Sequence, residues 1–441
     1  MARAKSLALD VSMNGQLVGQ YIRASSGRME FRYAETWLQQ KNAIALSLSL
    51  PLQERPWIGD QVNAVFENLL PDNAEIRRII AERSGAGGTD AFSLLARLGR
   101  DCVGALQFIP AGEDTPDIRI IEAEPVPDRD IAEILNGLAS APLGYDPDSD
   151  FRISIAGAQE KTALLRQGPQ WFHPRGATPT THILKPAIGM LSNGIDMTRS
   201  VENEWLCMTL AREFGLPTAD CEMADFDGTP CLVVHRFDRQ WSRDGSWILR
   251  LPQEDILQSL GYHPEQKYEN AGGPGIPAIM EQLKTSDRNT EDRLTFLRAQ
   301  IVFWMMAATD GHAKNFSIFL RPNNSFRLTP LYDILSVDHA LAAGGLRFKD
   351  IKLAMAVGAS RHYRIDEIFP RHWAQTAKQC DVPPDTALQM CRELANTAEG
   401  AITRAARQIP DNFPDEIATP ILDGIRKRAA ILSRTAPDTQ A

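Results

Sequence analysis

The pattern of hydrophobic and polar positions divides the chain into a strand-rich first part and a helical second part. Short runs in which apolar and polar residues alternate, typical of half-buried strands, recur before residue 238. After about Gln253, apolar residues recur at helical spacing over long stretches. We therefore predict an α+β fold with two lobes. The N-terminal lobe is rich in strands and carries an extra N-terminal subdomain, and the C-terminal lobe is all-helical.

Individual elements follow from this periodicity and from the Gly, Pro, Asn and Ser residues that interrupt it. Predicted strands cover residues 16–21, 29–33, 43–52, 105–109, 181–185, 222–226 and 231–237. Predicted helices cover residues 60–70, 74–83, 91–98, 131–138, 201–214, 288–308, 384–409 and 417–433. Residues 151–165 are expected to form strand, tight turn and strand, and residues 316–331 a hairpin that turns at Asn323 and Asn324.

Changes in composition indicate where domains begin and end. Residues 110–129 are rich in Pro, Asp and Glu, and a loop of Pro, Gly and Asp follows at residues 142–150. We predict an N-terminal subdomain over residues 1–145 and the rest of the N-terminal lobe over residues 146–237. The helical lobe then covers residues 238–435 and a short tail covers residues 436–441.

Composition and charge exclude several classes of protein. With 43% hydrophobic and 23% charged residues, the chain has the composition of an ordinary globular enzyme. Its net charge of −9 argues against a broad nucleic-acid-binding surface, which needs clustered Lys and Arg. The six cysteines have neither zinc-ligand spacing nor a disulfide-framework pattern. We find no signal peptide and no apolar stretch near the roughly 18 residues of a membrane span, and expect a cytoplasmic protein.

Three polar residues, Asp310, Asn315 and Asp333, are the main candidates for catalysis. Asp310 and Asn315 are separated by four residues, the interval at which kinase catalytic loops carry a base and a metal ligand. The predicted hairpin would return Asp333 to the same place. One carboxylate would then accept the proton of an attacking hydroxyl, while the other carboxylate and the amide oxygen hold Mg²⁺ on nucleotide phosphates. Asp and Asn are also ordinary turn residues, so the interval alone does not decide the function.

Two features of the strand-rich part are candidates for phosphate binding. The small residues Ala156 to Gln159 would let backbone N–H groups approach phosphate oxygens, although a plain hairpin turn explains them too. Lys185 ends an apolar strand, where it is either a solvated edge charge or a ligand of the phosphates. Glu202 and Glu204, in the first turn of the next predicted helix, are its candidate partners, and Glu204 is our choice.

The order of these features favours a two-lobed kinase architecture. A strand-rich lobe with Lys185, an extended segment near residue 238 and a helical lobe with Asp310 and Asp333 follow one another along the chain. In such a protein the nucleotide lies between the lobes, and the linking segment holds its base through backbone groups. The sequence therefore predicts a phosphotransferase with a two-lobed, kinase-like fold.

The chain resembles the HipA-type kinases, which are the toxins of bacterial type II toxin–antitoxin (HipBA) systems. The resemblance covers nearly the whole chain and rests on AGAQEK and DGHAKNFS in that order, together with further motifs. These are LSLSLPLQ at 46–53, FENLLPD at 66–72, GRDCVGAL at 99–106, DFRISIAGAQEKTALL at 150–165, TPTTHILK at 178–185, RFDR at 236–239, LRLPQED at 249–255, GGPGI at 272–276, ATDGHAKNFS at 308–317 and LTPLYDI at 328–334.

This resemblance implies a serine/threonine-protein kinase that uses ATP and Mg²⁺, with roles for particular residues. It implies that Asp310 is the base, that Asn315 and Asp333 bind metal, and that Ser154 is an autophosphorylation site whose modification ejects the phosphate loop and switches the enzyme off. The nucleotide contacts that it implies are Ile155, Ala156, Gly157, Ala158, Gln159, Lys185, His235, Arg236, Phe237, His312, Lys314, Asn315 and Asp333. His312 is equally well explained as a loop imidazole bonded to the backbone. His235 departs from the family, where a Glu tends to precede the RFD run.

The resemblance also implies partners. Similar proteins bind a dimeric helix-turn-helix antitoxin (HipB-like), and the complex represses its own operon. Operator DNA affinity would then come mainly from the antitoxin, which fits the acidic charge of this chain. The family's best-known target is glutamyl-tRNA synthetase, whose phosphorylation stops translation and promotes dormancy and antibiotic tolerance. Two alternatives stay open, a small-molecule phosphotransferase and a non-catalytic protein that holds antitoxin and DNA.

Overall fold

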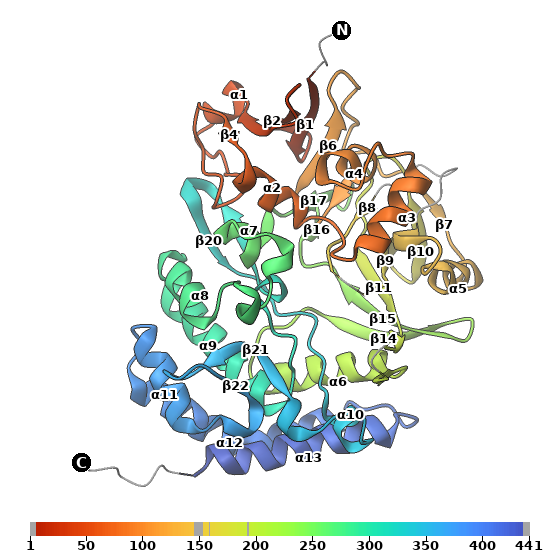
Figure 1. Cartoon of the computed structure of the whole chain (residues 1–441). Helices are drawn as coiled ribbons and strands as arrows, with labels where there is room; N and C mark the ends of the chain where they lie inside the picture. Colours follow the sequence, from red (N-terminus) through yellow and green to blue (C-terminus); the bar gives the residue numbers. More distant parts are fainter. Residues whose placement is uncertain (1–5, 145–152, 158, 192–193, 435–441) are drawn as a thin grey trace. The chain divides into compact units, whose positions relative to one another are not determined.

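The computed structural model in Figure 1 describes residues 6–144, 153–157, 159–191 and 194–434. The chain forms two compact units, each assembled from separate segments. The first unit contains Met1–Pro186, Ala224–Glu265 and Ser317–Phe326, and the second contains Ala187–Met223, Gln266–Phe316 and Arg327–Ala441. The predicted tail at residues 436–441 lies outside the described residues.

The first unit begins with a five-stranded antiparallel sheet in the order β4-β3-β2-β1-β6. Its strands are β1 (Leu7–Met13), β2 (Gln16–Arg23), β3 (Met29–Tyr33), β4 (Trp57–Ile58) and β6 (Leu106–Pro110). The helices of this part are α1 (Glu35–Leu38), α2 (Asp60–Glu67), α3 (Ala74–Ser84) and α4 (Ala91–Leu98). Alternate residues of β1 and β3 face one buried core, and a register shift in the pairing of β1 with β2 lets both Val18 and Tyr21 of β2 reach it.

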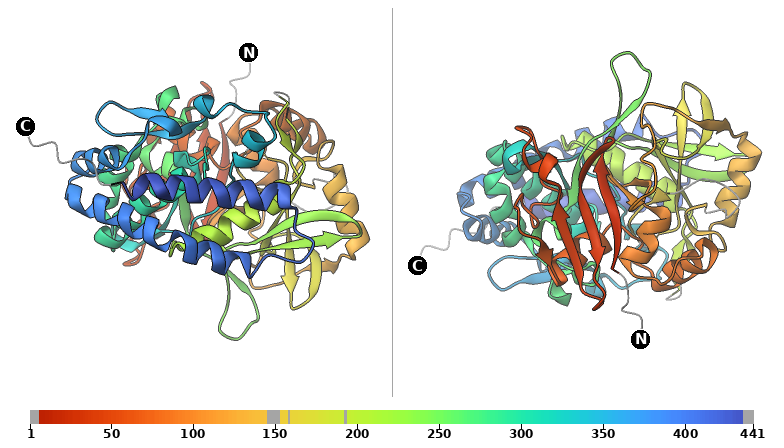
Figure 2. Two further views of the ribbon diagram at one scale, coloured as in Figure 1. Left: turned by 90° about the horizontal axis from the view of Figure 1, so that it is seen from below. Right: turned by 90° about the horizontal axis from the view of Figure 1, so that it is seen from above.

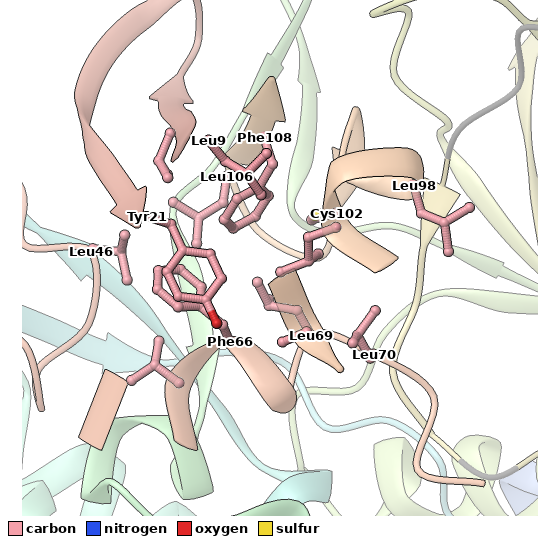
Figure 3. Close-up of a cluster of buried hydrophobic side chains, with 14 of the residues drawn as sticks. Leu9, Tyr21, Leu46, Phe66, Leu69, Leu70, Leu98, Cys102, Leu106 and Phe108 are labelled. Atoms are coloured by element: carbon pink, nitrogen blue, oxygen red, sulfur yellow. The ribbon is translucent and has the colours of Figure 1, made fainter. Parts of the chain in front are cut away.

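Aromatic side chains hold this core together, as Figure 3 shows. The rings of Tyr21 and Phe66 have centroids 4.1 Å apart, and Phe66 meets Phe108 edge-on at 5.4 Å. Leu9, on the neighbouring strand, is buried in the same cluster. Strands β1, β2 and β6 and helix α2 are thereby packed into one core.

A second sheet has six strands in the order β14-β15-β11-β9-β10-β7. These are β7 (Ala123–Pro125), β9 (Thr162–Gln167), β10 (Gln170–Pro174), β11 (His182–Pro186), β14 (Cys221–Phe226) and β15 (Thr229–His235). Helix α5 (Asp128–Gly137) buries Ile131 and Leu135 in a cluster with Leu164, Trp171 and Leu184 of this sheet. Shorter strands are β5 (Asp101–Cys102), which pairs in parallel with β8 (Ile153–Ser154), and β16 (Arg239–Trp241), which pairs with β17 (Ile248–Arg250).

Five buried charged side chains join remote segments of the first unit. Arg239 and Arg250 bond to Asp101 Oδ1 at 2.9 and 3.1 Å, and Arg236 bonds to Asp238 at 2.8 Å. Burial opposes the ionisation of Asp101, but the three arginines outweigh it and hold its pKa well below the usual range. The RFDR motif therefore belongs to a structural ion cluster that ties β5 to the residues that follow β15.

Most of the helices belong to the second unit. They are α6 (Ser200–Glu213), α8 (Ile276–Gln282), α9 (Asn289–Met305), α10 (Asp338–Ala342), α11 (Pro370–Gln379), α12 (Pro384–Ala406) and α13 (Asp415–Leu432). Figures 1 and 2 show α13 lying alongside α12. A buried ion pair between Arg428 and Asp338 fixes α13 to α10. Over the described part of the chain, no helix is both long enough and apolar enough to cross a bilayer.

The structure confirms most of the predicted elements, corrects two and adds a hairpin to the part that was predicted to be all-helical. Residues 43–52 form a tight turn bridged between Ser47 and Leu50 rather than a strand. Their serines are hydrogen-bonded to the remote carbonyl of Gln258, which is why they alternate with leucines. The segment around residues 151–165 is not a hairpin, because β8 pairs with β5 and not with β9. The hairpin of β21 (Lys352–Val357) and β22 (His362–Arg364) lies in the predicted all-helical part and was not predicted.

Glu254, in β18 (Gln253–Asp255), is a buried carboxyl that should make stability depend on pH. Burial raises its pKa to about 8, although the Leu48 N–H donates to it at 2.8 Å. Below pH ~4.5 both the folded and the unfolded chain bind this proton, so Glu254 does not make the free energy of unfolding depend on pH there. As the pH rises from there to 8, the folded chain alone retains the proton, and its stability falls by on the order of 1 kcal/mol per pH unit.

We therefore expect Glu254→Gln to be more stable than the parent at pH 8 and nearly equal to it at pH 4.5. Urea unfolding at several pH values measures this difference. Glu54→Gln, at an exposed position of the same unit, is the control and should follow the parent at every pH. Parallel pH profiles for Glu254→Gln and the parent would contradict the buried, protonated carboxyl.

Candidate active site

The loop from Asp310 to Asn315, which follows α9 in the second unit, is folded around the carbonyl group of Asp310. This carbonyl accepts a hydrogen bond from the His312 N–H at 2.8 Å and another from Asn315 Nδ2 at 2.8 Å. The Asn315 N–H donates to the His312 carbonyl at 2.9 Å. The loop is thereby fixed, with Asn315 buried and the Asp310 side chain 55% exposed. A half-exposed carboxylate on a fixed loop is accessible to a substrate hydroxyl.

Asp333 returns to this loop, as the predicted hairpin requires. Strands β19 (Ser317–Arg321) and β20 (Ser325–Leu328) are neighbours in one sheet, and Asn323 and Asn324 adopt positive φ angles in the turn between them. The hydroxyl of Tyr332 donates to the Lys314 carbonyl at 3.1 Å. Asp333 itself has a φ of 62°, a left-handed conformation that is uncommon outside glycine and often found at functional sites.

His312 lies in the same loop as a buried, neutral imidazole. Burial lowers its pKa, and the nearby charges of Asp310 and Asp333 oppose that shift without reversing it. Its Nε2 is 3.8 Å from Asp310 Oδ1, and its Nδ1 has no hydrogen-bond partner among the described residues. The influence of both carboxylates on one ring places Asp310, His312 and Asp333 in a single electrostatic site. A neutral ring with an unused nitrogen can bond to a ligand.

Asn315 and Asp333 fit a magnesium ion. The Asn315 nitrogen is occupied by the Asp310 carbonyl, so its side-chain oxygen is the atom that would bind metal. Magnesium prefers oxygen ligands and is usually held by one or two carboxylates together with substrate phosphates. Within the described ranges, no three or more His, Cys, Asp or Glu side chains form a metal site by themselves. The donors therefore suit a metal that arrives with a nucleotide.

In the first unit, the predicted phosphate loop is held at both ends. The Asp72 N–H donates to the Gly157 carbonyl at 3.2 Å, and Lys161 Nζ donates to the Ala156 carbonyl at 2.9 Å. Gly157 has a φ of 115°, which other residues rarely adopt, so the turn favours glycine. Gln159 Nε2 donates to the Pro186 carbonyl at 3.1 Å, which joins the loop to the end of β11. Ala158 lies outside the described residues.

Ser154 and Ile155, just before this loop, are buried. The Ser154 hydroxyl donates to the Leu69 carbonyl at 2.7 Å, and β8 pairs with Asp101 and Cys102. The loop is therefore anchored to the FENLLPD segment, whose Leu69 and Asp72 contact Ser154 and Gly157. In this conformation the Ser154 hydroxyl is not accessible.

Lys185 is buried in β11, opposite Leu232 of β15. His235 faces His182 three residue pairs along the same two strands. A strand rises about 3.3 Å per residue, so Lys185 and His235 are about 10 Å apart along the sheet. Because this separation is an odd number of residues, the side chains of Lys185 and His235 face opposite sides of the sheet, and a ligand on the Lys185 side would meet the backbone at position 235 rather than the ring.

The side chains at positions 235–237 differ in what they contact. The exposed His235 ring meets the His182 ring edge-on, with centroids 5.1 Å apart. Burial lowers the pKa of His182 to about 3, so that partner ring is neutral. Arg236 belongs to the buried ion cluster, and Phe237 packs edge-on against Phe319 at 5.7 Å. Arg236 would therefore contact a nucleotide through its backbone.

The two candidate partners of Lys185 differ in environment within α6. Glu202 forms an ion pair with Arg199 at 3.0 Å, whereas Glu204 is buried. Glu202 thus already has a local cation. Glu204 remains our choice for the carboxylate that would steady Lys185.

The predicted site residues form two groups, one in each unit. Asp310, His312, Asn315 and Asp333 are brought together in the second unit. The residues of the phosphate loop, Lys185 and positions 235–237 belong to the first. One residue missed by the sequence predictions is Tyr268, whose hydroxyl donates to the carboxylate of Asp310.

Comparisons with known protein families and relatives match most of the chain. Residues 153–402 match the family of HipA-like C-terminal domains, and residues 9–109 match the HipA N-terminal domain. The chain is 33% identical over 416 residues to "Putative kinase Y4mE" of Sinorhizobium fredii, spanning 92% of this chain and 94% of that one. It is 25% identical over 428 residues to the serine/threonine-protein kinase toxin HipA of Shewanella oneidensis, spanning 94% and 93%.

A solved structure shows the same fold. It is the complex of Shewanella oneidensis MR-1 HipA with HipB and its operator DNA, which matches with a TM-score of 0.80 and 22% identity. The match covers 96% of both chains. The predicted α+β fold is thereby confirmed.

Proposed function

The chain belongs to the HipA-like kinase family, and we propose that it is a serine/threonine-protein kinase toxin that transfers the γ-phosphoryl group of ATP to a protein serine. The observation that carries this proposal is the grouping of Asp310, Asn315 and Asp333 in the second unit. A half-exposed carboxylate lies on the same fixed loop as an amide oxygen, and a second carboxylate returns to that loop. This is the set of groups that phosphoryl transfer to a hydroxyl requires.

Each residue has a distinct task in this reaction. Asp310 accepts the proton of the attacking serine hydroxyl, and the hydrogen bonds of its carbonyl fix the loop that carries it. Asn315 and Asp333 hold Mg²⁺, which when bound neutralises charge on the phosphates. Lys185 and the backbone N–H groups of the loop at Ala156–Gln159 bind phosphate oxygens. The backbone at positions 235–237 orients the base.

We further propose that autophosphorylation of Ser154 switches the kinase off. A phosphate adds about 1.5 to 2 negative charges and three oxygens at a position that is now buried. The Leu69 carbonyl that accepts from Ser154 would then face an anion. The segment that carries Ser154 and the phosphate loop would then be displaced, and the affinity of the enzyme for ATP would fall.

The partners that we propose for this chain are inferred from those named for its relatives. The name of the Shewanella relative describes a toxin, and the HipA structure there includes HipB and operator DNA. We propose that this chain likewise is neutralised by a helix-turn-helix antitoxin dimer and represses its operon with it. Glutamyl-tRNA synthetase is the first target to test, with arrest of translation and a dormant, drug-tolerant state as the expected consequence.

The experiment that tests the enzyme function uses the full chain with Mg-ATP, alone and with glutamyl-tRNA synthetase, followed by mass spectrometry of all phosphosites. Asp310→Asn is the inactive control. Phosphate on Ser154 and on a protein serine, present with the parent chain alone, is the expected result. Binding of ATP without transfer to any protein would contradict a protein kinase. Transfer to a small molecule instead would identify the second candidate enzyme.

A further inference from the structure

The hydroxyl group of Tyr268 donates a hydrogen bond to the carboxylate of Asp310. Both residues belong to the second unit. The Asp310 side chain is 55% exposed, and a side chain so open to water would sample several rotamers if nothing held it. A phenol hydroxyl can donate a hydrogen bond and an ionised carboxylate can only accept, so Tyr268 is the donor in this contact.

Tyr268 is itself held in place by its neighbours. Its ring meets the His312 ring edge-on, with centroids 5.0 Å apart, and the Lys267 ammonium lies 5.5 Å from the ring centroid. Its carbonyl accepts from the N–H groups of Ala271 and Gly273, each at 3.0 Å. The tyrosine is therefore fixed on both its ring and its backbone.

The next residue, Glu269, anchors the segment to the β21–β22 hairpin. Its carboxylate accepts from the Ala356 N–H at 2.6 Å and forms an ion pair with Arg361 at 3.0 Å. The β21–β22 hairpin, which was not predicted from the sequence, therefore holds the segment that carries Tyr268 in place.

The GGPGI motif explains how this segment folds back on itself. A Cβ atom at Gly273 would lie 1.7 Å from the Gln266 carbonyl oxygen, and one at Gly275 would lie 2.4 Å from the Glu269 carboxylate. Gly272 has a φ of 92°, which other residues rarely adopt. Gly272 and Gly273 are therefore needed for this fold, and a side chain at Gly275 would displace the Glu269 carboxylate. The motif has no other task in the proposed mechanism.

We propose that Tyr268 is a positioning residue for the catalytic base, an inference that rests on the proposed function of Asp310. One carboxylate oxygen accepts from Tyr268, and the carboxylate is held so that the second oxygen accepts the proton of the substrate hydroxyl. Phosphoryl transfer depends mainly on the positions of its reacting groups, so a loosely held base would lower kcat. The residues proposed to bind ATP and Mg²⁺ are others, so loss of the Tyr268 hydroxyl is expected to leave the affinity for ATP nearly unchanged.

The kinetic test compares Tyr268→Phe with the parent chain. This change removes the hydroxyl and keeps the ring that packs on His312. We expect kcat to fall by about 10- to 100-fold, the range typical of one lost hydrogen bond to a charged group, while KM for ATP is unchanged. In Asp310→Asn, which has already lost the base, adding Tyr268→Phe should change the residual rate by less than about twofold. Thr397→Val, which removes an exposed hydroxyl of α12 in the same unit, is the control and should keep the parental kcat.

A second measurement does not depend on activity. Tyr268→Phe should lower the melting temperature by about 2 °C in the parent background and leave it unchanged in the Asp310→Ala background, because the hydrogen bond is then already absent. Suppose that the parent transfers no phosphate, but Tyr268→Phe lowers the melting temperature only where Asp310 is present. The proposed kinase function is then wrong, and the hydrogen bond between Tyr268 and Asp310 is confirmed. An unchanged kcat in Tyr268→Phe, equal melting-temperature shifts in both backgrounds, or phosphate on Tyr268 of the parent would each overturn the positioning role.

Discussion

Asp310→Asn is expected to lower the rate of phosphoryl transfer by about 10²- to 10⁴-fold, the usual contribution of a general base. The asparagine has the same shape as the aspartate, and the Asp310 carbonyl that organises the loop is unchanged. An amide oxygen still accepts from Tyr268, but it has no negative charge with which to take a proton. The loss should therefore fall on kcat, and the affinity for Mg-ATP should stay within about twofold.

The measurement combines steady-state kinetics with calorimetric titration of ATP. Asp381→Asn is the matched control, because Asp381 is an exposed aspartate of the same unit that pairs with Lys284 at 2.8 Å. It should retain the parental rate. If Asp310→Asn keeps more than about a tenth of the parental rate, Asp310 is not the base and the proposed mechanism fails.

Local patterns predicted the helices well, because each helix carries its own signals. Helix α4 begins and ends at the predicted residues, Ala91 and Leu98. Its apolar residues recur at helical spacing, and the Asp90 side chain caps it by accepting from the Ser93 N–H at 3.1 Å. The hairpin that returns Asp333 was predicted for the same reason, since its turn residues lie between its two strands.

Patterns failed where a remote segment decides the structure. The Leu/Ser alternation at residues 46–50 reads as a strand, but Ser47 and Ser49 bond to Gln258, more than 200 residues away. Strand β8 pairs with β5 about 50 residues earlier, and nothing within residues 151–165 indicates that partner. Non-local pairing leaves no periodic signal in the segment itself.

The candidate site shows the same division. Asp310, Asn315 and Asp333 were found because they lie close together in sequence around one hairpin. Tyr268 was missed because it is about 40 residues from Asp310, and its only local signal is the glycine-rich GGPGI segment that follows it. Glycines that crowd a carbonyl or a carboxylate are a sign that the chain must bring a nearby side chain to a fixed place.

Ser154→Asp is expected to lower the affinity for ATP by about 100-fold or more. The wild-type hydroxyl is buried and donates to the Leu69 carbonyl at 2.7 Å. A carboxylate cannot donate, so the two oxygens would face each other without a proton between them. Leaving a buried charge unpaired costs about 3 to 5 kcal/mol, which is comparable with what the buried Ile153 and Ile155 side chains contribute to holding this segment. The segment should therefore leave its place and take the phosphate loop with it.

Three substitutions separate charge from size in this prediction, with calorimetric titration of Mg-ATP as the measurement. Ser154→Ala removes one hydrogen bond, at a cost of about 1 kcal/mol of stability, and should keep ATP affinity within about threefold. Ser154→Asn has the size of aspartate without its charge, and its amide N–H can still donate to Leu69. We expect it to weaken ATP binding less than Ser154→Asp does. If Asn and Asp weaken binding equally, size alone displaces the loop. If Ser154→Asp binds ATP like the parent, a negative charge at this position does not control the phosphate loop, and the proposed switch at Ser154 fails even if the kinase is active.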